Sequence, residues 1–268
     1  MGILNVTPDS FYDGGLHTTP DAILAHARQL LADGADIIDI GVVSSRPGAI
    51  LLSPDEEAVR LVPVVTLLRR ELPAGTLLSV DTCYSLPASK AVEAGADMVN
   101  DISGGQLDPQ MFPTIASLQV PYVLMHMRGT PATMQLPANT QYGNIVEDLA
   151  DYFTAKLSLL EHQGVREVFL DPGFGFAKTL EQNHLLLHHL HQLVQLFPQH
   201  PFLIALSNKS MITRRLPSLA TAAAFPEVPA SEWGTLVLNT VALQAGASIL
   251  RVHSPRPACI AVDLLFDN

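Results

Sequence analysis

Short apolar segments rich in β-branched residues alternate with longer amphipathic segments along the whole chain of 268 residues. The short segments predict strands, because four to six apolar residues bounded by polar or glycine residues are typical of buried strands. They lie at Gly2–Val6, Asp36–Gly41, Thr76–Val80, Asp97–Asn100, Pro121–His126, Glu167–Leu170, Phe202–Leu206 and Ser248–Val252. Their regular alternation with helical segments indicates repeated βα units around a parallel sheet.

The expected helix boundaries support this alternation. Ser53, Pro54 and Glu56 combine an N-cap serine, a first-turn proline and a capping-box glutamate, so a helix is predicted to begin there. Three helical segments end in the same way, with Gly-Ala-Asp or Gly-Ala-Ser directly before a strand, at Gly34, Gly95 and Gly246. Glycine can adopt the left-handed conformation that ends a helix, so this recurrence is consistent with an internal βα repeat.

Eight βα units without a linker predict the α/β class and a (β/α)8 TIM barrel, with residues 1–268 in a single domain. The alternative is an open doubly wound sheet, which would carry a glycine-rich dinucleotide turn after its first strand. The residues at that place run from Asn5 to Ser10 and contain no glycine, which favours the barrel. Because the chain starts directly in a strand, the sequence leaves open whether an N-terminal segment that would cover the barrel floor is missing.

Composition narrows the range of partners. The net charge of −11 argues against nucleic acid and anionic membranes, because both require a broad positive surface. An anionic substrate would therefore need a local cluster of basic residues. No apolar run reaches the length of a membrane span, no signal peptide is recognisable, and Cys83 and Cys259 have no metal-ligand spacing. A soluble protein of the reducing cytoplasm is expected.

Polar residues stand at the C-terminal end of nearly every predicted strand, where (β/α) barrels carry their reacting groups. They are Asn5, Asp81, Asn100, Asp101, His126, Asp171, Ser207, Lys209, Arg251 and His253. Each one alone could simply cap a helix or hold a turn. Together, Lys209, Arg251 and His253 beside two aspartates predict a ligand that has both a hydrogen-bonding heterocycle and an anion. Loops after the seventh and eighth strands commonly bind phosphate in this fold.

Other candidate residues indicate structure more than chemistry. His184, His188 and His191 have helical spacing but no carboxylate or thiolate partners in register, so they predict a helix surface. Gly173-Phe174-Gly175 lacks the third glycine of a nucleotide fingerprint and is interpreted as a flexible turn beside a ligand. Asp39 lies inside an apolar strand and is expected to be a hydrogen-bonded barrel residue.

Several long motifs resemble those of the dihydropteroate synthases. The opening Met1-Gly-Ile-Leu-Asn-Val-Thr-Pro-Asp-Ser-Phe-Tyr-Asp-Gly-Gly15 is similar to their first motif, and Asp36–Gly41 with Ser44–Ala49 is similar to their second. Further matches are Ser79–Thr82, Val99–Gly105, Leu124–Pro131, Asp171–Thr179, Leu206–Ser210 and Ile249–His253. The resemblance therefore extends along almost the whole chain.

The resemblance implies a transferase of folate biosynthesis that joins 6-hydroxymethyl-7,8-dihydropterin diphosphate to para-aminobenzoate, releasing diphosphate and 7,8-dihydropteroate. The implied pterin-binding residues are Asp81, Asn100, Asp171, Lys209 and Arg251, with Asp81, Asp171, Lys209 and Arg251 as catalytic residues. Asn5, Arg251 and His253 would bind diphosphate, and Asn5 would also lie near Mg²⁺. Ser210, Ser45, Arg46 and Pro47 would bind para-aminobenzoate, and Thr7, Pro8 and Asp9 would belong to a closing loop. The family further implies a homodimer and a sulfonamide target.

The chain departs from the family pattern in three motifs. Asn208 replaces a usual arginine, Ser254 replaces an aspartate, and Val43 with Ser44 stand where a glutamate is frequent. These departures motivate one alternative, a non-catalytic pterin-binding paralogue. A corrinoid-linked methyltransferase shares the same barrel, but it is expected to lack the two long N-terminal loops and Ser210. No strong general base is evident, and an aromatic amine is already neutral near pH 7.

Overall fold

The computed structural model describes residues 1–6, 19–43, 48, 51–215 and 229–266, in which strands and helices alternate. The strands are β1 Gly2–Asn5, β2 Ile37–Gly41, β3 Leu77–Asp81, β4 Met98–Asp101, β5 Tyr122–Met125, β6 Val168–Asp171, β7 Leu203–Ile204 and β8 Ile249–Leu250. The helices are α1 Pro20–Ala32, α2 Pro54–Glu71, α3 Ser85–Glu93, α4 Met111–Leu118, α5 Ile145–His162, α6 Leu180–His188, α7 Leu190–Leu196, α8 Ser210–Thr213, α9 Ala230–Gln244 and α10 Pro255–Leu265, with a 3₁₀ turn at Pro137–Asn139.

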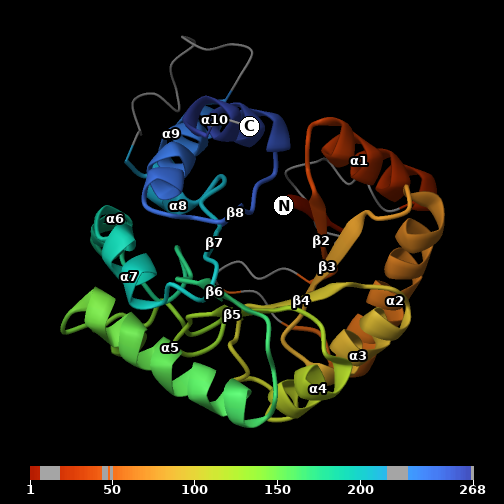
Figure 1. The fold of residues 1–268 in the computed structure, drawn as a ribbon, viewed down its shortest axis with the longest axis horizontal. Coiled ribbons are helices and arrows are strands. Elements are labelled where there is room, and N and C mark those ends of the chain that lie inside the picture. Colours follow the sequence, from red (N-terminus) through yellow and green to blue (C-terminus); the bar gives the residue numbers. More distant parts are fainter. Residues whose placement is uncertain (7–18, 44–47, 49–50, 216–228, 267–268) are drawn as a thin grey trace.

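The strands close into a barrel. β1 to β6 pair in sequence order, all parallel, and β7 pairs with β8. Single parallel bridges join Leu170 to Phe202 and Gly2 to Val252, which connects the short pair to both edges of the longer sheet. The helices form an outer ring around the strands (Figure 1). The predicted α/β barrel is therefore confirmed, whereas the predicted lengths of the last two strands are wrong, because regular pairing there covers only two residues.

Two hydrophobic layers result from the alternation of strand side chains. Outward-facing residues such as Leu4, Ile38 and Leu78 pack under the helices in the main core. Inward-facing residues fill the barrel interior in a separate cluster that includes Met1, Met98, Val123, Leu203 and Ala205. The barrel is thus filled with side chains, and Asp39 and Ser79 form a buried polar layer below the C-terminal ends of the strands.

The helix boundaries agree with the sequence signals. Ser53 caps α2, and its capping box with Glu56 is complete. Gly34, Gly95 and Gly246 have φ of 94°, 110° and 102°, so each ends its helix in the left-handed conformation. The histidine series is interrupted, because α6 ends at His188 and a new helix begins at Leu190. No group of His, Cys, Asp or Glu in the described part of the chain could hold a metal. None of the described helices is both long and apolar enough to cross a lipid bilayer.

Candidate active site

A row of polar residues crosses the C-terminal ends of the first four strands. Strand register pairs Asn5 with Gly41, Gly41 with Asp81, and Asp81 with Asn100. Gly41 leaves the space that the neighbouring side chains need: a Cβ atom on it would lie 3.3 Å from Asn5 Oδ1 and 3.8 Å from Asp81 Cβ. The side chains of Asn5 and Asp81 therefore converge over a glycine on the inner wall of the barrel.

The two neighbouring polar residues of β4 have different surroundings. Asn100 shares the inward parity of the row, and its amide donates to Asp39 Oδ2 at 3.0 Å. Asp101 faces outward, where it accepts hydrogen bonds from the Tyr122 hydroxyl at 2.7 Å and from backbone N–H groups of the following turn. Because successive side chains point to opposite faces of a strand, only the first of the two can face a ligand inside the barrel mouth.

Arg251 connects two layers of the interior. Its Nε donates to Asp39 Oδ2 at 2.6 Å, and its Nη2 donates to Asp81 Oδ2 at 2.9 Å. Asp39 is completely buried, so its role as a hydrogen-bonded barrel residue is confirmed. The second oxygen of Asp39 and the amide oxygen of Asn100 are buried and have no partner among the described residues. Buried acceptors of this kind are usually satisfied by a water or a ligand.

Asp171 and Lys209 complete the inner wall from the other side. Asp171 ends β6, is buried, and accepts the Gly173 N–H at 2.7 Å. Lys209 is the N-cap of α8, and its Nζ donates to the Phe174 carbonyl and lies 5.1 Å from the ring centroid of Phe176. Charge attraction couples Lys209 to Asp171 and Asp81. The carboxylates and cations predicted from the sequence are therefore brought together.

Burial and charge shift the titration of this cluster. Burial raises the pKa of Asp81 to about 7, although the nearby Arg251 opposes the shift. Burial likewise raises the pKa of Asp171, against the effect of Lys209. Burial lowers the pKa of Lys209 to about 8, with Asp171 opposing. Burial also acts to lower the pKa of Arg251, but Asp39 and Asp81 outweigh it and hold that pKa above its usual value.

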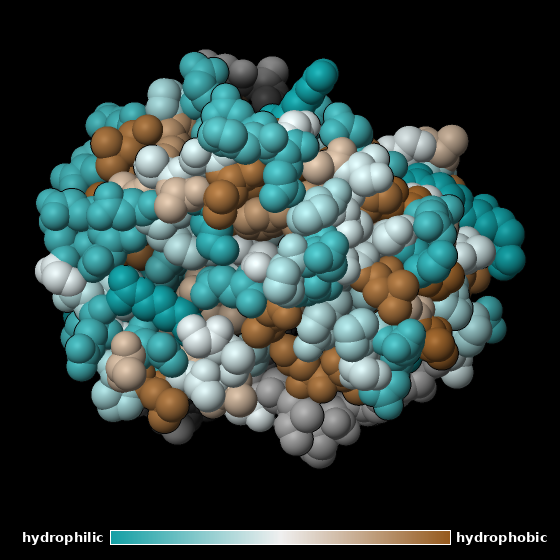
Figure 2. All heavy atoms as spheres, turned by 90° about the horizontal axis from the view of Figure 1, so that it is seen from below, coloured by the Kyte–Doolittle hydropathy of each residue, from teal (hydrophilic) through white to brown (hydrophobic). Residues whose placement is uncertain are grey.

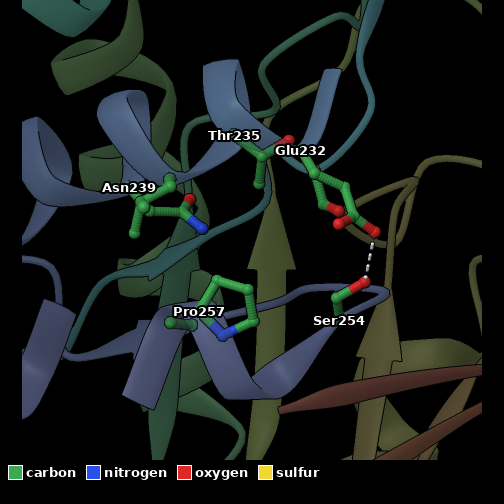
Figure 3. Close-up of a pocket in the computed structure, with 8 residues that line it drawn as sticks. Glu232, Thr235, Asn239, Ser254 and Pro257 are labelled. Atoms are coloured by element: carbon green, nitrogen blue, oxygen red, sulfur yellow. Dashed lines mark hydrogen bonds between the residues drawn. The ribbon is translucent and has the colours of Figure 1, made fainter. Parts of the chain in front are cut away.

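His253 lies at the rim of the same mouth. It is exposed, and its Nδ1 is 2.9 Å from the Ser207 hydroxyl. Next to it, the Ser254 hydroxyl donates to Glu232 of α9 at 2.9 Å. Figure 3 shows this bond beside a small cavity between α9 and α10 into which Asn239 also extends. None of the predicted pterin-binding residues lines this cavity, so it is not the predicted pterin pocket.

Two of the departures from the family pattern have a local explanation. Asn208 has φ of 55°, a left-handed conformation that asparagine tolerates better than most residues, and its N–H donates to the Thr235 hydroxyl at 3.2 Å. Ser254 is held by Glu232 as described above. Both contacts attach the loops after β7 and β8 to helix α9.

The remaining predicted residues have less defined surroundings. Ser210 begins α8 and is exposed, next to Lys209. Thr7, Pro8, Asp9, Ser45, Arg46 and Pro47, predicted for the closing loops and for para-aminobenzoate, lie outside the described residues.

The sequence did not predict the buried pair formed by Lys178 and His126. Lys178 is 2% exposed, and its Nζ lies 3.0 Å from Nδ1 of the buried His126. His126 was expected to line the mouth, but it is buried and contacts Lys178 instead. The only available signal was the position of Lys178 in the Asp171–Thr179 motif. The expected flexible turn after β6 is a hydrogen-bonded loop around this lysine.

Comparison with known proteins identifies the class to which this fold and site belong. Residues 1–253 match the family of pterin binding enzymes, and the chain belongs to that family. A dihydropteroate synthase of Synechocystis sp. is 42% identical over 255 residues, which cover 94% of this chain and 84% of the relative.

Solved structures give the same result at the level of the fold. The Yersinia pestis dihydropteroate synthase in complex with a sulfonamide drug superimposes with a TM-score of 0.87 at 37% identity, covering 98% of this chain and 91% of the other. The Xanthomonas albilineans dihydropteroate synthase with 4-aminobenzoic acid has a TM-score of 0.83 at 35% identity, with coverage of 98% and 90%. The resemblance first seen in the motifs is therefore confirmed over nearly the whole chain.

Proposed function

We propose that this protein is a dihydropteroate synthase, which joins 6-hydroxymethyl-7,8-dihydropterin diphosphate to para-aminobenzoate and releases diphosphate and 7,8-dihydropteroate. The observation that supports this most directly is the inward-facing set of Asp81, Asn100, Asp171, Lys209 and Arg251 at one end of a barrel of the pterin-binding family. The family membership alone would allow other pterin chemistry, and the gathered cations at the mouth favour a substrate that carries a diphosphate.

The inner wall suits the edge of a pterin. That edge presents an amino group and a ring N–H as donors, with carbonyl and ring nitrogen acceptors, so it requires both carboxylates and amides. Asp81 and Asp171 would accept from the donors, and Asn100 would use its amide oxygen, which has no partner among the described residues. Lys209 would donate to the acceptors. A ligand that left one of these buried groups unpaired would lose affinity, which is the basis of specificity.

Arg251 would serve the pterin and the leaving group together. Asp39 and Asp81 hold its guanidinium at a fixed place on the inner wall, where a planar cation can lie against a heterocycle. His253 and Asn5 follow the adjoining strands β8 and β1, and both would contact the diphosphate from this side of the mouth. Because these donors are already in place, they stabilise the charge that grows on the departing oxygen without reorganising.

The reaction is a displacement at the exocyclic methylene of the pterin. The C–O bond to diphosphate breaks, the amine nitrogen forms the C–N bond, and the amine then loses a proton to solvent or to the released diphosphate. Much of the C–O cleavage is expected to precede attack, and Asp81 and Asp171 would stabilise positive charge on the ring. A neutral aromatic amine needs no strong base, so the absence of an evident one in the sequence agrees with this route.

Para-aminobenzoate would bind at the rim, with its carboxylate near Ser210. This residue follows Lys209 directly, so a carboxylate bound there would keep para-aminobenzoate next to the proposed pterin site. Ser45, Arg46 and Pro47 would complete this subsite, and Thr7, Pro8 and Asp9 would close over it. Sulfonamides resemble para-aminobenzoate in shape and charge, so we expect them to compete for the same place.

Mg²⁺ is proposed as the metal. The described residues offer no cage of acidic ligands, and the carboxamide oxygen of Asn5 is the suitable hard donor beside Asp81. This fits Mg²⁺, which usually keeps several waters and binds through one or two protein oxygens plus substrate phosphates. When bound, the ion would neutralise charge on the diphosphate. Asn5 would hold the ion. Measuring the affinity for diphosphate at increasing Mg²⁺ concentrations tests this role.

A homodimer through α9 and α10 is also proposed. Trp233, Val237 and Val241 follow one another at intervals of four on the exposed face of α9, and Ile260 and Leu264 are exposed on α10. The buried face of α9 contains Thr235 and Asn239 as well as Ala242 and Leu243, so this helix has apolar residues on both its buried and its exposed face. On the face seen in Figure 2, by contrast, apolar groups are scattered among polar ones. Val237→Asp should yield a monomer in light scattering, whereas Leu159→Asp on α5 should not.

We also propose that the chain forms a single domain. A cytoplasmic location is proposed because both cysteines are free thiols. The decisive experiment is an assay of diphosphate release and dihydropteroate formation with Mg²⁺ and both substrates. Turnover is expected. Tight pterin binding in calorimetry without turnover would instead identify the non-catalytic paralogue, for which Asn208 and Ser254 are the motivation.

A further inference from the structure

Lys178 is a buried cation for which the proposed function provides no task. Its ammonium nitrogen has three acceptors within hydrogen-bonding distance: His126 Nδ1 at 3.0 Å, the Gly173 carbonyl at 3.0 Å and the Phe176 carbonyl at 3.1 Å. An ammonium group has three N–H bonds, so this set matches its capacity. Burying a lysine is costly unless every donor is satisfied, and a lysine kept in such a place needs a reason.

The loop between β6 and α6 is folded around this nitrogen. Gly173 has φ of 68°, and a Cβ on it would lie 2.1 Å from the His126 carbonyl, so no other residue fits there. The loop is fixed at its start by the bond from Gly173 N–H to Asp171 and further along by the bond from Gly175 N–H to Asn183 Oδ1 at 2.6 Å. Lys178 joins two carbonyls that are three residues apart.

The same loop packs against the side chain of Lys209. The Phe174 carbonyl accepts from Lys209 Nζ, the Phe176 ring lies 5.1 Å from that nitrogen, and the Cβ position of Gly175 is 3.3 Å from Lys209 Cδ. Three consecutive loop residues, 174–176, thus lie next to Lys209. Of the two carbonyls that accept from Lys178, that of Gly173 lies directly before this stretch and that of Phe176 lies at its end.

We propose that Lys178 is a positioning residue for pterin recognition, which fixes the loop 173–176 so that Lys209 presents its ammonium to the pterin. Lys178 itself does not touch the substrate. This inference rests on the proposed pterin-binding role of Lys209. Lys178 is then a second lysine that contributes to pterin binding, and its effect passes entirely through the backbone of the loop.

The electrostatics of the neighbourhood agree with this arrangement. Burial and the charge of Lys178 lower the pKa of His126 well below its usual value, so the imidazole is neutral and can accept at Nδ1. Burial lowers the pKa of Lys178 as well, and the attraction of Asp171 opposes the shift. Asp171 therefore interacts with a lysine from the loop and with Lys209 at the start of α8.

A double-mutant cycle tests the inference. Binding of 6-hydroxymethylpterin is measured by calorimetry for wild type, Lys178→Met, Lys209→Met and the double variant. Lys178→Met should weaken binding by about tenfold in the wild-type background and by less than about twofold when Lys209 is already absent, because coupled residues are not additive. Equal weakening in both backgrounds, or none in the wild-type background, would overturn the inference.

Control variants separate positioning from a general loss of structure. Lys90→Met removes an exposed lysine of α3 and should bind the pterin like wild type. Lys178→Arg keeps a cation with several donors and should recover most of the affinity. Lys178→Gln, whose amide can still donate to both carbonyls, is used in the cycle if the methionine variant does not fold. Near-wild-type binding by Lys209→Met would refute the proposed role of Lys209 itself, a result distinct from failure of the cycle.

Discussion

Strands β1 to β6 are four or five residues long and pair continuously, whereas β7 and β8 pair over two residues and join the sheet through single bridges at Leu170 and Gly2. The two regions also differ in charge. The continuous sheet carries the buried carboxylates and the amide, and the short pair carries Lys209, Arg251 and His253 at its ends. Backbone register therefore places the acidic half of the site directly.

The basic half needs additional contacts. Arg251 is positioned by Asp39 and Asp81 across the barrel, and Lys209 by the loop after β6. Helix α9 attaches both loops through Thr235 and Glu232. Arg251 thus takes its position from the continuous sheet and Lys209 from the loop that follows β6, so a substitution in either half should be felt in the other.

The largest effect is expected from Arg251→Met. This change leaves Asp39, which is completely buried, without its cation, and breaking a buried pair typically costs about 3–5 kcal/mol. Urea unfolding should show this loss of stability. Arg256→Met is the matched control, because Arg256 pairs with Asp33 at the surface and should contribute less than about 1 kcal/mol. A similar loss in both variants would mean that the two regions are not coupled through Asp39.

Asp81→Asn is expected to affect catalysis more than stability. Arg251 keeps its bond to Asp39 in this variant, but the pterin loses a charged acceptor and the ring loses a stabilising charge. We expect kcat/KM to fall on the order of 10²–10³-fold, the usual effect of removing one preorganised electrostatic group. Asp151→Asn, on the exposed face of α5, should be unaffected. Near-equal rates for wild type and Asp81→Asn would refute the role assigned to Asp81.

The pH dependence of kcat/KM should be a narrow bell. The carboxyl of Asp81 has its pKa raised to about 7, so it becomes protonated and loses its acceptor charge as the pH falls below that value. Lys209 has its pKa lowered to about 8 and loses its charge as the pH rises above it. Each limb should approach about tenfold per pH unit, with apparent pKa values that belong to the coupled cluster. A flat profile between about pH 6 and pH 9 would contradict this electrostatic account.

The sequence predicted where the carboxylates and the amide of the first four strands lie, because strand periodicity and parallel register are local properties. Period-two alternation even separates Asn100 from Asp101, although we first grouped them at the same strand end. The eight strands and the glycine helix ends were predicted for the same reason. The motif resemblance, in turn, supplied roles that periodicity could not.

The contacts of Asp39 and Lys178 could not be predicted in the same way. The Asp39–Arg251 bond joins residues 212 positions apart, and it depends on barrel closure and on the length of the arginine side chain. Lys178 and His126 were not distinguishable from surface or mouth residues, because burial of a cation depends on how a loop folds around it.

The smallest effect is expected at the rim of the short-strand half. His253 is exposed, and when its side chain is changed the buried Ser207 hydroxyl still accepts the backbone N–H of residue 253. We expect His253→Gln to raise the KM for the pterin diphosphate by about five- to tenfold, because one charge-assisted contact to phosphate contributes roughly 1–1.5 kcal/mol at an exposed site. The KM for para-aminobenzoate should stay constant. An equal rise in both KM values would place His253 outside the diphosphate subsite, whereas a selective rise would show that even the weakly paired strands position a specific contact.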